Sequence, residues 1–431
     1  MKKVAFITLG CKVNQYETNA MIQEFIQKGY EIVENSEKAD IYVVNTCTVT
    51  NMSDRKSRQM LRRAKELNKE AIIIACGCYV QVAKEEVEKI EEIDLLFGNN
   101  EKKNIVEIVE QYLKENKKQN VMEDVMSQRE FVDFGDITYT EKTRAVIKVQ
   151  DGCDRFCSYC IIPYARGRVR SRKPKSIISE IEKIAKEGIK EVVITGIHIA
   201  SYGKDFKEEY KLIDLLEEIN QIKKIERIRL GSIEPLLITE EFVNRLVKLE
   251  KVCHHFHLSL QSGCDETLKR MNRRYSTEDF KEIVLRLRRY YEDVVLTTDI
   301  IVGFPQETEE EFEKTYKFLK EIKFYKMHVF KYSPRKGTKA AEMSGQVDGN
   351  IKEERSQRLI ELSDKNEKGY NKSYIGKEVE VLFEEEKNGY YQGHTKNYIL
   401  ALCKTNKDLE NQIIKLKCTD IEENNIIVEL K

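Results

Sequence analysis

Three cysteines in the middle of the chain have a spacing that restricts both its chemistry and its fold. They are Cys153, Cys157 and Cys160, with three and then two residues between them. Three thiolates at this spacing can bind three irons of a [4Fe–4S] cube and leave the fourth iron open. An open coordination position distinguishes a reactive metal site from a closed structural one. The chain contains 11 Cys in 431 residues, so chance would produce this pattern only about 0.007 times.

Two other kinds of site also use closely spaced cysteines: zinc sites and ferredoxin-type electron carriers. Zinc sites usually combine two pairs of Cys or His ligands. The bacterial ferredoxin motif keeps two residues between its first cysteines, whereas the first gap here is three residues. The spacing therefore favours an open iron–sulfur cluster over both alternatives.

Length and composition indicate a soluble protein of two or three domains. Lys plus Arg and Asp plus Glu both number 74, so a nucleic-acid site would have to be a local patch. The first apolar run is too short for a secretory signal, and no run is long enough for a membrane span. We therefore expect a cytoplasmic protein. An odd number of cysteines without an export signal favours metal binding or reduced thiols over disulfides.

Residues 1–113 alternate apolar runs with amphipathic segments, which predicts an open parallel sheet covered by helices. We expect strands at Val4–Leu9, Ile41–Asn45, Ile72–Cys76 and Ile93–Phe97. We expect helices at Asn14–Lys28, Ser53–Leu67 and Val82–Ile90.

Three further cysteines follow strands of this predicted sheet. Cys11, Cys47 and Cys78 each stand just beyond the end of one strand. The carboxyl ends of parallel strands share one edge, where ligands bind, so the three thiols can meet there. Cysteines are also common inside sheets, and that alternative suits Cys76, which lies within its strand. The pattern favours a second three-cysteine site slightly over buried structural cysteines.

The rest of the chain predicts a linker, a partial barrel and a small β-barrel. Residues 114–138 are polar and lack periodicity, which is typical of a linker. Residues 139–368 alternate strands and helices six times, too few for a closed eight-stranded barrel, so we expect an open (β/α)6 barrel. In residues 369–431 several short strands and the Asn388-Gly389 hairpin signal predict a β-barrel.

The expected strands of the partial barrel are Ala145–Gln150, Glu191–Thr195, Arg227–Leu230, Phe256–Leu260, Val294–Asp299 and His328–Tyr332. The first of them leads directly into Cys153. Chemistry in such folds takes place at the carboxyl ends of the strands. The small β-barrel has a weak charge signal for RNA binding, because residues 371–431 contain nine Lys, no Arg and eleven acids.

The chain resembles the radical S-adenosylmethionine (SAM) methylthiotransferases over its whole length. The motif around Cys153 lies within Gly152-Cys-Asp-Arg-Phe-Cys-Ser-Tyr-Cys-Ile-Ile-Pro-Tyr-Ala-Arg-Gly167. Three further strings agree: Asn45-Thr-Cys-Thr-Val-Thr50, Gly77-Cys-Tyr79 and Asp299-Ile-Ile-Val-Gly-Phe-Pro305. The string Thr8-Leu-Gly-Cys-Lys-Val-Asn-Gln-Tyr-Glu17 resembles the branch that acts on threonylcarbamoyladenosine beside the anticodon of tRNA.

The resemblance implies an N-terminal methylthiotransferase domain, a radical SAM core and a C-terminal TRAM domain. It implies two [4Fe–4S] clusters: a radical SAM cluster on Cys153, Cys157 and Cys160, and an auxiliary cluster on Cys11, Cys47 and Cys78. The cofactors would do the chemistry, because no side-chain acid or base can remove an aromatic hydrogen. We expect no catalytic side chain beyond the cluster ligands. The reaction would need tRNA, an electron donor such as flavodoxin or ferredoxin, and a sulfur source.

Further site residues follow from the same resemblance and from position. Residues that could contact SAM are Tyr159, Thr195, Gly196, Ser232 and Gln261, although each also suits an ordinary loop or core role. A basic stretch beside the cluster could bind the phosphates of the tRNA anticodon stem-loop; its arginines are Arg155, Arg166, Arg168, Arg170 and Arg172. Alternative substrates are isopentenyl-adenosine in tRNA and an aspartate of a ribosomal protein. An alternative of another class is a non-catalytic iron–sulfur or zinc protein that binds RNA.

Overall fold

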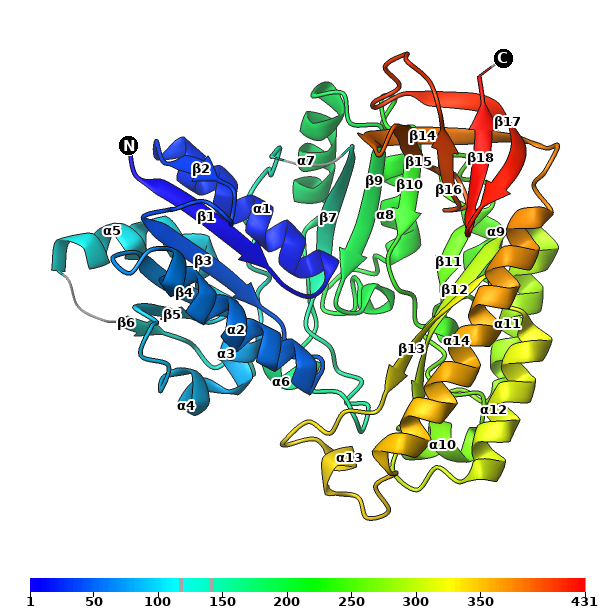
Figure 1. The fold of residues 1–431 in the computed structure, drawn as a ribbon, viewed down its shortest axis with the longest axis horizontal. Coiled ribbons are helices and arrows are strands. Elements are labelled where there is room, and N and C mark those ends of the chain that lie inside the picture. Colours follow the sequence, from blue (N-terminus) through cyan, green and yellow to red (C-terminus); the bar gives the residue numbers. More distant parts are fainter. Residues whose placement is uncertain (116–118, 140–142, 431) are drawn as a thin grey trace.

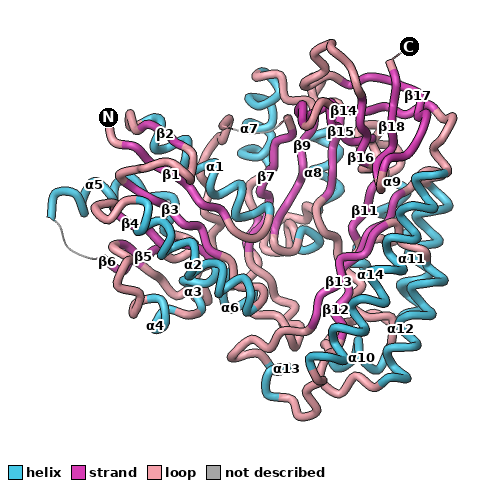
Figure 2. The backbone as a smooth tube through the Cα atoms, viewed as in Figure 1, coloured by secondary structure: helices cyan, strands magenta, loops and turns pink. Residues whose placement is uncertain are grey.

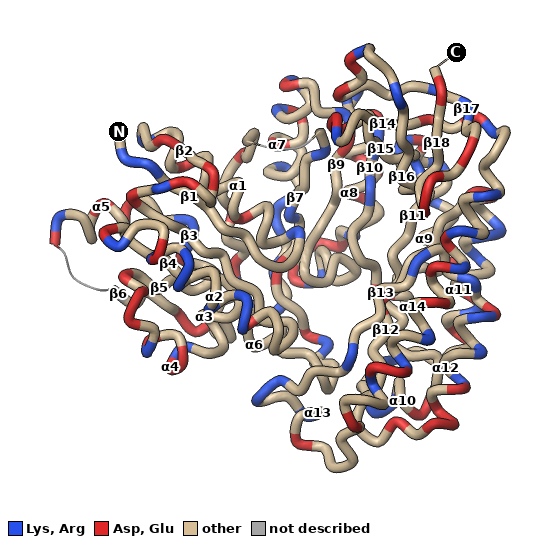
Figure 3. The backbone as a smooth tube through the Cα atoms, in the orientation of Figure 1, with Lys and Arg blue, Asp and Glu red and all other residues tan. Residues whose placement is uncertain are grey.

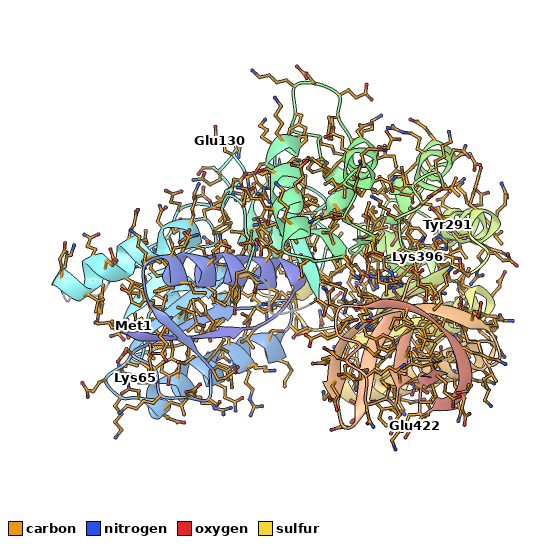
Figure 4. All side chains as sticks on the ribbon, turned by 90° about the horizontal axis from the view of Figure 1, so that it is seen from above. Met1, Lys65, Glu130, Tyr291, Lys396 and Glu422 are labelled. Atoms are coloured by element: carbon orange, nitrogen blue, oxygen red, sulfur yellow. The ribbon has the colours of Figure 1, made fainter. Side chains whose placement is uncertain are left out.

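The computed structural model describes residues 1–115, 119–139 and 143–430. The chain forms three successive parts: an α/β domain, an open barrel and a small closed barrel (Figure 1). Figure 4 marks the first part by Met1 and Lys65, and the closed barrel by Glu422 on the opposite side of the molecule. This arrangement is the α/β fold class that the sequence predicts.

The N-terminal domain contains six parallel strands in the order β2-β1-β3-β4-β5-β6. The strands are β1 (Lys3–Thr8), β2 (Glu31–Val33), β3 (Ile41–Thr46), β4 (Ile72–Gly77), β5 (Leu95–Phe97) and β6 (Gln119–Val121). The helices are α1 (Lys12–Gln27), α2 (Asn51–Leu67), α3 (Cys78–Val82), α4 (Lys84–Val87) and α5 (Ile105–Glu115), with a 3₁₀ turn at Glu101–Asn104.

Alternate residues of this sheet pack against helices on opposite faces. Val4 of β1 lies in one apolar cluster with Phe25 of α1 and Val109 of α5. Its neighbour Ala5 lies in a second cluster with Leu61 of α2. Because both faces are covered, the strands are almost continuously apolar, as parallel sheets require.

Six parallel strands form the open barrel of the central domain: β7 (Arg144–Asp151), β9 (Glu191–Gly196), β10 (Arg227–Leu230), β11 (His255–His257), β12 (Val295–Val302) and β13 (Lys326–Lys331). A short antiparallel strand, β8 (Arg170–Ser171), pairs with β7. The strands form two sheets, joined by the bridges Ile228–Val252 and Ile233–Leu258. Among the described residues β8 and β13 are the edge strands, each with a neighbouring strand on one side only. They do not pair with each other, so the barrel is open, as expected (Figure 2).

Helices pack on the outside of this barrel: α7 (Pro174–Lys186), α8 (Leu212–Asn220), α9 (Glu240–Leu246), α10 (Asp265–Arg270), α11 (Thr277–Tyr290), α12 (Glu309–Ile322) and α14 (Gly349–Lys372). Two short helices lie apart from this layer: α6 (Ile162–Arg166), which contacts α3, and α13 (Lys339–Glu342). The 3₁₀ turns are Ile199–Ser201 and Pro235–Leu237. Local sequence fixes the start of two of the longer helices. Ser276 and Thr308 each form a capping box, in which hydroxyl and carboxylate satisfy free backbone N–H groups.

The C-terminal strands close into a barrel in the order β14-β15-β16-β18-β17. They are β14 (Glu378–Lys387), β15 (Tyr390–Thr395), β16 (Leu400–Cys403), β17 (Ile413–Glu422) and β18 (Asn425–Glu429). Asn388 and Gly389 both have positive φ, as the predicted hairpin turn requires. Arg227 of β10 donates to the carbonyl oxygens of Glu380 and His394, at 3.0 and 2.9 Å. These bonds attach the closed barrel to the central domain.

The structure departs from the sequence-based expectation in the segment 114–138. We expected an irregular linker there, but β6 adds a sixth strand to the N-terminal sheet beside β5. Three residues are too few to show a period in the sequence.

No helix in the described ranges combines the length and apolar character of a membrane span. Basic and acidic residues are interspersed over the chain (Figure 3).

Candidate functional site at the domain interface

The three N-terminal cysteines lie at one edge of the parallel sheet. Cys11 and Cys47 follow β1 and β3, and Cys78 is the first residue after β4. These strands are direct neighbours, so their ends converge as predicted. Gly10 leaves room for this approach: a Cβ on Gly10 would lie 2.8 Å from Cys47 Sγ. This edge therefore provides three thiols and, at Gly10, space that a side chain would fill. Both features suit a cluster held by three cysteines.

Asn14 of α1 holds two of the cysteine-bearing loops together. Its amide nitrogen donates to the carbonyl oxygen of Leu9 at 2.7 Å and to that of Thr46 at 3.0 Å. Leu9 and Thr46 stand just before Cys11 and Cys47 in the sequence. The side chain of Asn14 is fully buried. It therefore fixes the spacing of the two loops from inside the protein.

Cys76 and Cys78 have different surroundings. Cys76 is fully buried within β4 and belongs to an apolar cluster of the sheet. Cys78 lies at the end of the strand, where its Sγ accepts a hydrogen bond from Arg166 Nε at 3.2 Å and a longer one from Asn99 Nδ2 at 3.9 Å. Polar donors stabilise a thiolate, the form that binds iron. The geometry thus favours Cys78 as the third ligand.

The central cysteines occupy the loop that follows β7. Gly152 precedes them with φ +71°, and a Cβ there would lie 1.8 Å from the carbonyl oxygen of Arg168. Phe156, between the first two cysteines, also has positive φ, at 47°. A non-glycine residue in this conformation is strained and typical of functional loops. The Arg273 side chain donates to Cys157 Sγ at 3.4 Å, so in each trio a sulfur accepts from an arginine side chain.

Burial raises the pKa of Cys47 and of Cys153 to about 11, and that of Cys160 to about 12. These three thiols are therefore protonated at neutral pH. Binding iron must therefore release protons. Among the described residues, no three His, Cys, Asp or Glu side chains are grouped to hold a single metal ion. A cube instead spreads its thiolates over separate irons.

A cavity of about 480 Å³ joins the two cysteine trios. Its walls include Cys11 and Cys47 from the N-terminal domain and Cys160 from the central domain. Ligand sites usually occupy about 300–1,000 Å³. Tyr159 and Gln261, two of the five residues proposed for SAM contact, also line this cavity.

The other three proposed SAM residues lie outside the walls of this cavity. Thr195 and Gly196 end β9, and Ser232 follows β10 with an exposed side chain. A Cβ on Gly196 would approach the carbonyl oxygen of Gln150 to 2.9 Å, so packing explains this glycine. These three residues do follow strands of the open barrel, as the sequence predicts, but the cavity is formed nearer to β12 and β13.

The basic stretch is the main correction to the sequence analysis. Arg166, Arg170 and Arg172 were expected to bind RNA phosphates, but their side chains are fully buried and face carboxylates. A guanidinium group that is enclosed by protein cannot reach a phosphate in this conformation. Arg155 is half-buried. Arg168 is exposed and stacks on the ring of Phe156, 5.0 Å from its centre.

Sequence reasoning missed three residues that contact or position the cysteines: Asn14, Asn99 and Arg273. Asn14 stands three residues after Cys11, at the start of α1, where a buried amide leaves no mark in a hydrophobicity pattern. Arg273 lies in the polar turn after α10 and reaches Cys157 only through the fold. The available signal was a polar residue near a strand end, which is too common to select these three.

Two family models match the chain in separate regions. The Radical SAM superfamily matches residues 147–319, and the Uncharacterized protein family UPF0004 matches residues 3–98. The first match covers most of the open barrel, without β13, and includes Cys153, Cys157 and Cys160. The second covers the part of the N-terminal domain with Cys11, Cys47 and Cys78.

Solved structures of low sequence identity share the fold. The radical S-adenosylmethionine methyltransferase TsrM from Kitasatospora setae is 16% identical, with a TM-score of 0.56 over 77% of this chain and 73% of that one. The cobalamin-dependent S-adenosylmethionine radical enzyme OxsB has a TM-score of 0.52 at 13% identity, over 85% of this chain and 56% of that one. At these low identities, both similarities show a shared fold and no more.

Curated relatives match nearly the full length. Threonylcarbamoyladenosine tRNA methylthiotransferase MtaB of Bacillus subtilis is 42% identical over 97% of this chain and 94% of its own. The protein of that name from Aquifex aeolicus is 43% identical over 92% and 95%. A tRNA-2-methylthio-N(6)-dimethylallyladenosine synthase from Caldicellulosiruptor saccharolyticus is 35% identical over 97% and 88%. With both cysteine trios, both matched domains and this similarity, the chain belongs to the radical SAM methylthiotransferase family.

Proposed function

We propose that this protein converts threonylcarbamoyladenosine, next to the anticodon of tRNA, to its 2-methylthio derivative. As a family member it is an enzyme that uses SAM and two [4Fe–4S] clusters. Bound together, these cofactors supply a carbon-centred radical and a sulfur donor, which an unactivated aromatic carbon requires. The cavity shared by Cys11, Cys47 and Cys160 carries the proposal, because it brings both sites to one substrate.

The assignment of the ligands follows the geometry. Cys153, Cys157 and Cys160 would hold the radical SAM cluster, and Cys11, Cys47 and Cys78 the auxiliary cluster. Tyr159 and Gln261 would border SAM, since they line the cavity beside Cys160. Thr195, Gly196 and Ser232 have weaker support, because they lie outside its walls.

The surface around the cavity has features suited to RNA. Val49 and Phe330 line the cavity and are exposed, at 52% and 45%. Such apolar side chains can contact splayed bases, while exposed cations hold phosphates. Arg168 and the basic face of α2 are candidates for the phosphates; that face carries Arg55, Lys56, Arg62 and Arg63.

Several finer points belong to the same proposal. We place the protein in the cytoplasm, where tRNA is modified, with flavodoxin or ferredoxin as a candidate electron donor and a separate sulfur source. We divide the chain into a methylthiotransferase domain (1–113), a connecting segment (114–138), a radical SAM core (139–368) and a TRAM domain (369–431).

Mass spectrometry of tRNA nucleosides from a deletion strain tests the substrate. Loss of 2-methylthio-threonylcarbamoyladenosine, restored by the intact gene, supports the proposal, and its persistence contradicts it. Loss of the methylthio derivative of isopentenyl-adenosine instead would favour the second candidate, which the 35% identical synthase suggests. An anaerobically reconstituted protein that binds RNA but does not cleave SAM would support a non-catalytic binder.

A further inference from the structure

Six charged side chains form one buried network between the N-terminal and central domains. They come from α1, the 3₁₀ turn before α5, β7, α6 and β8. None is more than 4% exposed. The network consists of two carboxylates and four cations: Glu17, Asp151, Lys102, Lys148, Arg166 and Arg170.

Glu17 is the centre of this network. Its carboxylate accepts from Lys102 at 2.5 Å and from Lys148 at 2.7 Å, and it also pairs with Arg166. Burial alone would raise the pKa of Glu17, but the attraction of Arg166, Lys102 and Lys148 outweighs it and lowers this pKa well below its usual range. Glu17 is therefore ionised.

Asp151 completes the network. It pairs with Lys148 at 2.6 Å, Arg166 at 3.4 Å and Arg170 at 3.7 Å. Three cations thus surround one buried carboxylate, an arrangement that favours its ionised form. Two negative charges thus face four positive ones, and the network has a net charge of 4 − 2 = +2.

Two surplus positive charges in a protein interior need a counter-charge, since burying unpaired ions is costly. Glu101, a further carboxyl next to Lys102, is a poor candidate: it accepts from the backbone N–H of Glu123, and burial raises its pKa. The cysteine edge is the better candidate, because Arg166 Nε lies 3.2 Å from Cys78 Sγ. The other side of the same guanidinium donates to Asn14 Oδ1 at 2.6 Å.

We propose that this network supplies the counter-charge of the auxiliary cluster, so that its surplus of two positive charges raises the cluster's reduction potential. The inference rests on the proposed function, because it assigns the auxiliary cluster to Cys11, Cys47 and Cys78. A [4Fe–4S] cube with three thiolates carries one negative charge when oxidised and two when reduced. The surplus therefore matches the reduced form, and net charge and hydrogen bonds to sulfur are known determinants of cluster potential.

The sign of the effect can be tested with two substitutions that change the network charge in opposite directions. Lys102→Met reduces the surplus from two to one and should make the auxiliary cluster harder to reduce. Glu17→Gln increases the surplus to three and should make it easier to reduce. Each change should alter the reduction equilibrium at least tenfold, which is 59 mV for a one-electron couple. The double variant restores the surplus and should return close to the parent potential.

The experiment uses the full-length chain with Cys153, Cys157 and Cys160 replaced by alanine, so that only the auxiliary cluster is present. Potentials are measured by anaerobic titration followed by electron paramagnetic resonance. The matched control is Glu180→Gln, which removes an equally buried carboxylate from the separate pair with Arg172. It should shift the potential by much less than Glu17→Gln.

The outcomes separate this inference from the proposed function. If the parent chain binds no auxiliary cluster, the function proposal itself fails. If the cluster forms but both single variants shift its potential in the same direction, or by no more than Glu180→Gln does, the proposal that the network is the counter-charge is wrong. If one single variant does not fold, the sign of the other still decides. Folding is checked by circular dichroism.

Discussion

Replacing Gly10 by alanine is the most direct test of the proposed auxiliary site. Gly10 has φ +99°, and a Cβ there would lie 2.8 Å from both Cβ and Sγ of Cys47. Carbon atoms in contact prefer about 3.5–4.0 Å, so Cys47 would have to move by about 0.7–1.2 Å. Metal–ligand distances tolerate only about 0.2 Å. The substitution should therefore displace one ligand beyond what iron binding allows.

Gly29 provides a matched control in the same domain. It has a similar φ of +81°, but a Cβ there would meet nothing within 4 Å. Both substitutions incur the left-handed backbone cost of about 1–2 kcal/mol. Only Gly10→Ala adds an overpacking cost, of about 1–3 kcal/mol. The difference between the two variants isolates the contact with Cys47.

Iron per chain after anaerobic reconstitution is the primary measurement. We expect about eight irons in the parent protein and in Gly29→Ala, and about four in Gly10→Ala, because the radical SAM cluster has separate ligands. Gly10→Ala should still cleave SAM to 5′-deoxyadenosine but should not transfer sulfur to tRNA. Eight irons and normal sulfur transfer in Gly10→Ala would refute the placement of a cluster against Cys47.

Three other substitutions test separate parts of the structure. Cys157→Ala should abolish SAM cleavage while the auxiliary cluster stays visible by spectroscopy; retained cleavage would refute its assignment to the radical site. Arg335→Ala leaves the largely buried Asp54 without its 2.6 Å partner and should lower the free energy of unfolding by about 3 kcal/mol. A loss below about 1 kcal/mol in chemical denaturation would contradict this. Arg168→Ala breaks an exposed pair with Asp154 and the exposed stacking on Phe156, so stability should change by less than about 2 kcal/mol, whereas the slope of tRNA affinity against salt should fall by about 1. An unchanged slope would exclude phosphate contact.

The positions of the six cysteines in the fold were predictable because their signal is local. Each N-terminal cysteine follows an apolar strand, and parallel strands bring their carboxyl ends to one edge whatever the rest of the chain does. The Cys153 motif needs only its own spacing. In both cases a few residues of sequence are enough to define the geometry.

The buried arginines were not predictable for the opposite reason. Arg166, Arg170 and Arg172 lie in a run without acidic neighbours, which is typical of an exposed basic face. Their partners Glu17 and Glu180 are 149 and 8 residues away from the arginines they pair with. Arg166 meets its partner only because α1 docks against the central domain, whereas Arg170 and Arg172 pair with Asp151 and Glu180 of their own domain. A run of basic residues therefore indicates an exposed surface only where no carboxylate from another part of the fold pairs with it.

The relative position of the two cysteine trios depends on contacts that cross the domain boundary. Arg166 is the last residue of the short helix α6, six residues after Cys160, and its side chain donates to Cys78 Sγ of the other trio. A second contact across the boundary is made by Arg335, which donates to Thr48, next to Cys47, at 2.6 Å. Under the proposed function one substrate base would have to reach both trios, so an error of about 1 Å in their separation would be costly. Each of these two arginines bonds to more than one residue of the N-terminal domain. They should therefore tolerate lysine poorly, because its single ammonium cannot span both partners.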